Sequence, residues 1–159
     1  MSNKLLVDTN ILIYAHLPNE HFHAVAKNKI EELSSEFELI ITRQIIREFL
    51  KVKSLIMYQN NKFDSKELIR DADFFEDNFT ILDEDKNTTD NLLHLIDAFQ
   101  VKGNQIHDCN IVASMLENQV FKIFTHNVKD FKRYEPLIQI IPLFDNEIEH
   151  SIHVIGLKP

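Results

Sequence analysis

Three acidic residues, Asp8, Glu48 and Asp108, lie at positions where a carboxylate is costly to place. Asp8 directly follows a short apolar run without alternation, which is typical of a buried strand. At helical spacing, Glu48 flanks one apolar stripe and Asp108 projects into the middle of another. An unpaired carboxylate beside a core costs several kcal/mol or stays protonated, so these acids need partners.

A divalent metal ion is the partner that suits such a group. Carboxylates that crowd together raise one another's pKa unless a cation holds them. Their hard oxygen atoms favour Mg²⁺ or Mn²⁺, which can activate a water for attack on a phosphodiester. The scattered histidines and the single cysteine indicate no zinc site, and with two glycines the chain has no phosphate-binding glycine loop.

Each acid also has an ordinary structural interpretation. Asp8 could cap the next helix, and Asp108 could be a helix-start acid favoured by the helix dipole. Glu48 could be a solvated glutamate beside Arg47 or Lys51. All three acids lie where a strand ends or just inside the following helix, so a parallel sheet would bring them to one edge. That convergence favours a shared site.

The elements that would position the acids alternate between strand-like and helical spacing. Apolar runs predict strands at 5–7, 38–42, 79–82, 120–125 and 137–141. Helical patterns cover 10–16, 20–34, 44–57, 64–77, 88–100 and 105–118, with Asp64 and Glu67 as a capping box. This order predicts an α/β fold, a three-layer α/β/α sandwich around a central, mainly parallel sheet.

Length and composition predict one globular domain. The chain has 159 residues, of which 44% are hydrophobic and 26% charged, and this is enough to bury a core. No segment has the apolar length of a membrane span, and the amino terminus leaves no room for a signal peptide, which predicts a cytoplasmic protein without a membrane partner. The single cysteine, Cys109, is interpreted as core packing rather than as a nucleophile.

The charge distribution carries more information than the net charge of -8, which argues against indiscriminate coating of nucleic acid. Residues 43–53 and 122–133 each carry a net charge of +3, so the rest of the chain carries -14. These basic segments surround Glu48 and the residues near Asn127. They predict phosphate contacts beside an acidic metal centre, with solvated helix and loop faces as the alternative.

Taken together, these features resemble the PIN-domain nucleases, and within them the VapC-type toxins of bacterial toxin–antitoxin pairs. The resemblance covers residues 5 to about 142 and rests on four short motifs in the order typical of the family. The motifs are VDTNIL at 7–12, REF at 47–49, HDCNIVA at 107–113 and THNVKDF at 125–131.

The resemblance implies a metal-dependent nuclease that cuts RNA. It implies that Asp8, Glu48 and Asp108 are catalytic and hold the metal, and that Asn127 occupies a fourth catalytic position that is often Asp in the family. Because Asn127 removes one charge, one tightly held Mg²⁺ or Mn²⁺ ion is expected. The expected supporting residues are Asn10, Thr125 and Asp130, and the expected RNA-binding residues are Arg43, Arg47, Lys129 and Lys132.

Partners and domain limits follow from the same resemblance. A toxin would need an antitoxin protein that covers the acidic site, and a homodimer is also expected. The predicted nuclease domain spans residues 1–142. Residues 143–159 are predicted to form a carboxy-terminal extension that packs on the same domain, and no role is assigned to it.

Other functions stay open. Asp8 could be the nucleophile of a phosphatase or phosphotransferase. However, such enzymes of the haloacid dehalogenase type have a second Asp two residues later, where this chain has Asn10. A PIN fold that binds RNA or protein without cutting is disfavoured because three acids are present. An RNA-processing nuclease that is not a toxin is the remaining alternative.

Overall fold

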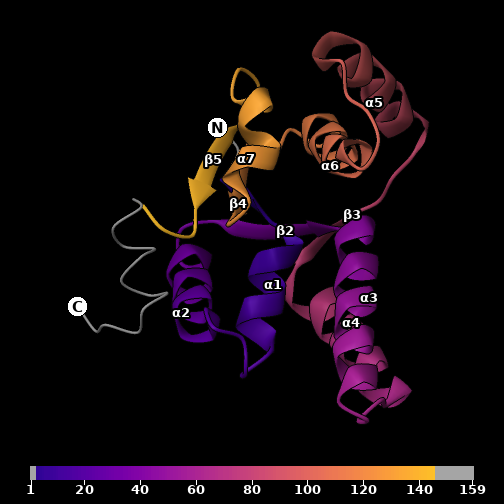
Figure 1. Cartoon of the computed structure of the whole chain (residues 1–159). Coiled ribbons are helices and arrows are strands. Elements are labelled where there is room, and N and C mark those ends of the chain that lie inside the picture. Colours follow the sequence, from indigo (N-terminus) through magenta and orange to yellow (C-terminus); the bar gives the residue numbers. More distant parts are fainter. Residues whose placement is uncertain (1–2, 146–159) are drawn as a thin grey trace.

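One five-stranded sheet organises the computed structural model, which describes residues 3–145 (Figure 1). The strands are β1 Lys4–Val7, β2 Glu38–Thr42, β3 Thr80–Leu82, β4 Lys122–Thr125 and β5 Gln139–Pro142. They lie in the order β3-β2-β1-β4-β5, and every neighbouring pair is parallel. The predicted parallel sheet is therefore confirmed.

Helices cover both faces of this sheet. Across residues 3–145 they are α1 Thr9–His16, α2 His23–Ser34, α3 Arg43–Gln59, α4 Ser65–Asn78, α5 Lys86–Phe99, α6 Gln105–Glu117, α7 Val128–Phe131 and a 3-10 helix at Lys132–Tyr134. In Figure 1, α1 to α4 lie on one side of the sheet and α5 to α7 on the other. This arrangement confirms the predicted three-layer α/β/α sandwich.

The strand order changes direction between β1 and β4. The chain passes from β1 to β2 and β3 along one face, then returns across the opposite face to place β4 beside β1. Connections that leave two adjacent strands toward opposite faces open a crevice at the carboxyl ends of those strands. Asp8 and Thr125 lie at this point, where the Asp8 amide donates to the Phe124 carbonyl at 3.0 Å.

The central strands are buried on both faces because helices cover both. The side chains of Leu5, Leu6 and Val7 are fully buried, as are Ile123 and Phe124 in the neighbouring strand. Continuous apolar runs are expected in such strands, since neither face meets water. Cys109 is also fully buried in this core, which confirms its interpretation as a packing residue.

The predicted boundaries agree with the structure to within three residues, and one local detail is different. Asp64 caps α4 as predicted, because its carboxylate accepts from the Lys66 amide at 2.9 Å. The Glu67 carboxylate lies 2.7 Å from the Lys53 ammonium instead of completing a capping box. A tertiary ion pair thus replaces the predicted local contact.

The predicted carboxy-terminal extension begins with two buried residues. Leu143 is fully buried and Phe144 is nearly so, and the Leu143 amide donates to the Thr125 carbonyl at 3.1 Å. Residues 146–159 lie outside the described residues, so the placement of the extension stays a prediction. Within the described part of the chain, no helix is long and apolar enough to cross a membrane.

Candidate active site

Asp8 lies at the end of β1 with its carboxylate held by three donors. The Thr9 amide donates to Oδ1 at 2.7 Å, while Asn10 Nδ2 and Thr125 Oγ1 donate to Oδ2 at 2.6 and 2.7 Å. Asp8 is 6% exposed and also caps α1, so the capping interpretation is realised together with burial at the sheet edge. The sequence signal for this residue was its place at the end of an apolar strand.

Glu48 projects from α3 toward the same edge. Its Oε2 atom accepts from the Thr9 hydroxyl at 2.8 Å, and Oε1 accepts from Gln44 Nε2 at 2.7 Å. Thr9 therefore contacts two of the predicted acids, one through its amide and one through its hydroxyl. The neighbouring Arg47 lies 3.7 Å from Glu84, so its guanidinium is directed to a different acid.

Asp108 lies in the first turn of α6 and is half-buried. Burial, together with the nearby charges of Asp130, Asp8 and Glu48, raises the pKa of its carboxyl to about 7. Arg133 opposes this shift with its positive charge. Among residues 3–145, no hydrogen bond reaches the Asp108 carboxylate, so this acid is held in place by its helix alone.

The pKa of Asp8 is also raised, but less than that of Asp108. Burial raises the pKa of its carboxyl to about 6, against the opposing hydrogen bonds from Thr125, Thr9 and Asn10. The Glu48 charge also raises this pKa. In the described part of the chain, no lysine or arginine forms an ion pair with Asp8, Glu48, Asp108 or Asp130. The described site is therefore negative, and only the more distant charge of Arg133 opposes its acids.

A divalent cation fits this site by charge and by donor type. Carboxylate oxygens are the ligands that Mg²⁺ and Mn²⁺ prefer, and a cation would offset the burial and the repulsion that raise the pKa of Asp8 and Asp108. In residues 3–145, however, no three Asp, Glu, His or Cys side chains are yet arranged as a ligand group. The carboxylates of Asp8 and Glu48 lie instead against Thr9, Gln44, Asn10 and Thr125.

The segment after β4 brings Asn127 and Asp130 to the site in different ways. The Asn127 amide donates to Thr125 Oγ1 at 3.0 Å, while the exposed side chain makes no capping bond to α7. Asp130 is exposed in the first turn of α7, and it is the largest charge contribution to the raised pKa of Asp108. Asp130, which is predicted as a supporting residue, therefore affects the pKa of Asp108 more than Asp8 or Glu48 does.

Of the predicted RNA-binding residues, Arg43 is held by two ion pairs, while the other three are exposed. Arg43 forms ion pairs with Glu76 and Asp83, which hold its guanidinium away from the acids. Arg47, Lys129 and Lys132 are exposed. Lys53, counted in the basic segment 43–53, is buried and faces α4, so it is not available for phosphate contacts.

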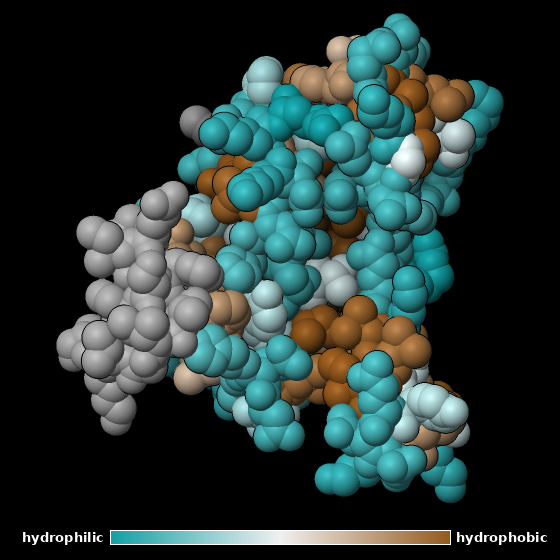
Figure 2. All heavy atoms as spheres, in the orientation of Figure 1, coloured by the Kyte–Doolittle hydropathy of each residue, from teal (hydrophilic) through white to brown (hydrophobic). Residues whose placement is uncertain are grey.

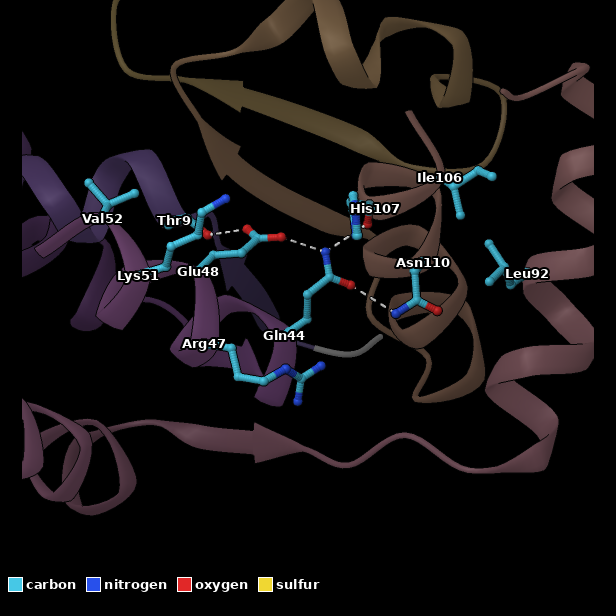
Figure 3. Close-up of a pocket in the computed structure, with 10 residues that line it drawn as sticks. All are labelled: Thr9, Gln44, Arg47, Glu48, Lys51, Val52, Leu92, Ile106, His107 and Asn110. Carbon is cyan, nitrogen blue, oxygen red and sulfur yellow. Dashed lines mark hydrogen bonds between the residues drawn. The ribbon is translucent and has the colours of Figure 1, made fainter. Parts of the chain in front are cut away.

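Sequence reasoning missed the side chain that connects α3 to α6. Gln44 is 6% exposed, and its Nε2 donates to Glu48 Oε1 and to the His107 carbonyl at 2.9 Å. Its Oε1 accepts from Asn110 Nδ2 at 2.9 Å, and Figure 3 shows Gln44 between Glu48 and Asn110. Only its spacing of one helical turn before Glu48 could have indicated this role.

A cleft of about 610 Å³ opens beside these residues, between α3 and the α5–α6 pair (Figure 3). Thr9 and Glu48 belong to its wall, so the cleft adjoins the acids. Its remaining lining residues come from α3, α5 and α6. A ligand in this cleft would therefore lie within reach of the acidic site.

The sequence profile of the PIN domain family matches residues 5–136. This chain belongs to the PIN domain family. The match includes Asp8, Glu48, Asp108 and Asp130, the acids that the fold brings to one sheet edge. No curated protein matches the sequence of this PIN domain.

Solved structures share the fold of this PIN domain at low sequence identity. One is VapBC2 from Rickettsia felis, bound to a DNA fragment from its promoter. It has 22% identity and a TM-score of 0.63, over 87% of this chain and 97% of that one. VapBC-1 from nontypeable Haemophilus influenzae has 18% identity and a TM-score of 0.64, with the same coverage. Mycobacterium tuberculosis VapC20, a sarcin–ricin loop cleaving toxin, has 11% identity and a TM-score of 0.57, over 76% and 87% of the chains.

Proposed function

We propose that this PIN domain is a metal-dependent endoribonuclease and the toxin of a toxin–antitoxin pair. The observation that carries the proposal is the group of acids from β1, α3, α6 and α7 that lacks a basic partner among residues 3–145. Burying negative charges together is unfavourable unless the site works with a cation. The structural similarity to VapC20, a sarcin–ricin loop cleaving toxin, supports RNA as the substrate.

Asp8, Glu48 and Asp108 are the proposed catalytic residues and metal ligands, with Asn127 and Asp130 beside them. A bound Mg²⁺ or Mn²⁺ ion would supply a water of lowered pKa and neutralise charge on the attacked phosphate. Asn10 and Thr125 orient Asp8, and Thr9 with Gln44 orients Glu48. Asp108 must lose its proton before it can act as a ligand, because its pKa is about 7.

The exposed cations on both sides of the acids would position the RNA strand. Arg47 lies one residue before Glu48, while Lys129 and Lys132 flank Asp130 on the segment after β4. Phosphate contacts from such residues place a strand without reading its sequence. We propose no direct phosphate contact for Arg43, because Glu76 and Asp83 already neutralise it.

An antitoxin is the proposed protein partner, because several similar structures are toxin–antitoxin complexes. Figure 2 shows apolar surface over the part of the molecule where α3 and α4 lie. Leu55 on α3 is 50% exposed, and Ile69 and Phe74 on α4 are 61% and 45% exposed. Exposed apolar surface is typical of a protein interface, either with an antitoxin or with a second copy of this chain.

We further propose that residues 1–142 form the nuclease domain and that 143–159 extend it without a catalytic role. A cytoplasmic location is proposed with it, since the RNA substrate would be found there. Removing residues 146–159 should then leave metal-dependent cleavage unchanged.

The decisive experiment is cleavage of a mixed pool of cellular RNA by purified wild type and Asp108→Asn. Each protein is assayed with Mn²⁺, with Mg²⁺ and with excess chelator. Asp97→Asn, which changes an exposed acid on α5, is the matched control. Cleavage that needs metal, is lost in Asp108→Asn and persists in Asp97→Asn supports the proposal.

Two outcomes of this experiment would contradict the proposal. Equal cleavage by wild type and Asp108→Asn would point to a contaminating nuclease. No cleavage by folded, metal-loaded, partner-free wild type would favour a PIN fold that binds RNA or protein without cutting it.

A further inference from the structure

We infer that the cleft between α3 and the α5–α6 pair binds the base of one unpaired RNA nucleotide, next to the phosphodiester that the acids would cut. The inference rests on the proposed RNA substrate, and it identifies the part of that substrate which this surface recognises. The cleft volume of about 610 Å³ lies within the range of roughly 300–1,000 Å³ that is ordinary for small-ligand sites.

Apolar side chains from three different helices line the cleft. Val52 comes from α3, Leu92 from α5 and Ile106 from α6. Ile106 is 37% exposed, and the other two are half-buried. Enzymes that take a base out of its stack hold it between aromatic or apolar side chains. A phosphate or sugar would gain little from these contacts, whereas the faces of a base would be desolvated favourably.

Two cations line the same cleft on successive turns of α3. Arg47 and Lys51 are exposed, and the nearest acid to the Arg47 guanidinium is Glu84 at 3.7 Å. Within residues 3–145, Lys51 forms no ion pair. Positive charge beside an apolar floor is complementary to a nucleotide, whose phosphates flank the base. An apolar peptide segment would leave Lys51 without a counter-charge.

Asn110 supplies a polar group at the edge of the cleft. Its Nδ2 donates to Gln44 at 2.9 Å, and its Oδ1 points to the side on which Leu92 lies (Figure 3). No hydrogen bond reaches this Oδ1 atom from the described residues. It can therefore accept from an amino or imino group on the edge of a base, as single-stranded RNA is commonly read.

The cleft reaches Glu48, one of the acids of the site, and this sets the position of the reacting phosphate. Thr9 and Glu48 form part of its wall, and the Thr9 hydroxyl donates to Glu48 at 2.8 Å. A nucleotide whose base occupies the cleft would present its adjoining phosphate to Glu48 and to the two other acids. RNA loops and other unpaired segments can place a base in this way, but a duplex cannot.

The test measures binding in excess chelator, so it does not depend on catalysis. The first probe is a labelled single-stranded RNA of about ten nucleotides with alternating adenine and uracil bases, a length typical of single-strand-binding grooves. The second probe has the same backbone and length but is abasic throughout. Wild type should bind the base-containing strand about 10-fold more tightly than the abasic strand.

The variants change the apolar floor and a matched neighbour. Leu92→Gln should reduce the base preference from about 10-fold to about 2-fold. Ile106→Gln should have the same effect, and it is the variant that folds most safely because Ile106 is partly exposed. Leu93→Gln is the control, since Leu93 is 58% exposed on the same helix and lies outside this cleft. It should keep the wild-type preference.

The outcomes separate this inference from the proposed nuclease activity. Equal binding of both probes by wild type would overturn the inference, even if metal-dependent cleavage is observed. A base preference that survives in both folded variants would also overturn it, because the base would then bind elsewhere. A base preference that both variants lose would support the cleft as the base site, even in a protein that fails to cleave RNA.

Discussion

Two charged residues of α3, Lys53 and Glu48, belong to groups that differ in charge compensation. Lys53 is 6% exposed, and its ammonium lies 2.6 Å from Asp71 and 2.7 Å from Glu67 on α4. Glu48, five residues earlier on the same helix, belongs to a group of acids without a basic partner in the described part of the chain. One group is neutralised within the protein, and the other is not.

The pKa shifts show the consequence of this difference. Burial lowers the pKa of Lys53, but the hydrogen bonds to Asp71 and Glu67 outweigh it and raise the pKa overall. Burial and neighbouring charges raise the pKa of Asp8 to about 6 and that of Asp108 to about 7. Lys53 keeps its charge at neutral pH, whereas Asp8 and Asp108 are ionised at a cost. Such a cost is expected where an external cation completes the site.

The largest expected effect is on RNA cleavage, and it comes from changing one of the acids that lack a basic partner. Asp8→Asn should reduce metal-dependent RNA cleavage by a factor on the order of 10³ or more, because it removes a metal ligand at the centre of the site. The measurement is single-turnover cleavage with Mn²⁺. Asp73→Asn, at an exposed acid on α4, is the control and should cleave like wild type. Residual cleavage above one tenth of wild type would argue against Asp8 as a ligand.

The ion-paired group of Lys53, Glu67 and Asp71 should affect the stability of the fold instead of RNA cleavage. Lys53→Met should lower the free energy of unfolding by about 2–3 kcal/mol, because it leaves the partly buried Asp71 without its counter-charge. Urea unfolding measures this change, with the exposed Lys66→Met as control. The combined variant Lys53→Met, Glu67→Gln and Asp71→Leu should recover most of the loss. No recovery would mean that packing rather than charge explains the effect of Lys53.

Gln44 contacts Glu48 and orients its carboxylate without neutralising its charge. Gln44→Met should weaken Mn²⁺ binding by about 10–100-fold, as expected when a group that orients a metal ligand is removed. Isothermal calorimetry measures the affinity, and circular dichroism verifies the fold. Gln59→Met, at the exposed end of the same helix, should bind Mn²⁺ like wild type. Unchanged affinity in Gln44→Met would show that Gln44 does not orient a metal ligand.

The smallest expected effect is a gain in stability at the site itself. The raised pKa of Asp108 means that the folded state holds its proton above pH 3.8, where the unfolded chain releases it, so stability falls as pH rises toward about 7. At pH 8 without metal, Asp108→Asn should be more stable than wild type by about 1 kcal/mol, after allowance for the solvent screening of a half-exposed group. This gain should shrink as the pH falls toward 4.

Urea unfolding of wild type and Asp108→Asn at several pH values, in excess chelator, measures this gain. A difference that does not change with pH would assign the effect to packing instead. The raised pKa values of Asp8 and Asp108 also imply that Mn²⁺ affinity increases with pH up to about 7 and then levels off.

Much of the fold could be predicted because its signals are local. Apolar runs without alternation predicted buried strands, and the strand ends located Asp8 before any contact was known. The contacts of Thr9 and Gln44 could not be predicted, because each depends on another helix or on a residue far along the chain. Lys53 was assigned to a basic segment for the same reason, since charge counts do not reveal that α4 packs against α3.

The sequence by itself determined which segments are strands and helices and that acids follow them. Only the tertiary structure decided that β4 lies beside β1, which brings the Thr125 hydroxyl to 2.7 Å from Asp8 across 117 residues. It also decided that Gln44 reaches the backbone of His107 in α6 across 63 residues. Periodicity reports the exposure of each segment, whereas strand order depends on how all the segments pack together. For this reason the acids could be predicted from the pattern, but the contacts of Thr9 and Gln44 could not, and Asn10 and Thr125 were expected only through the family resemblance.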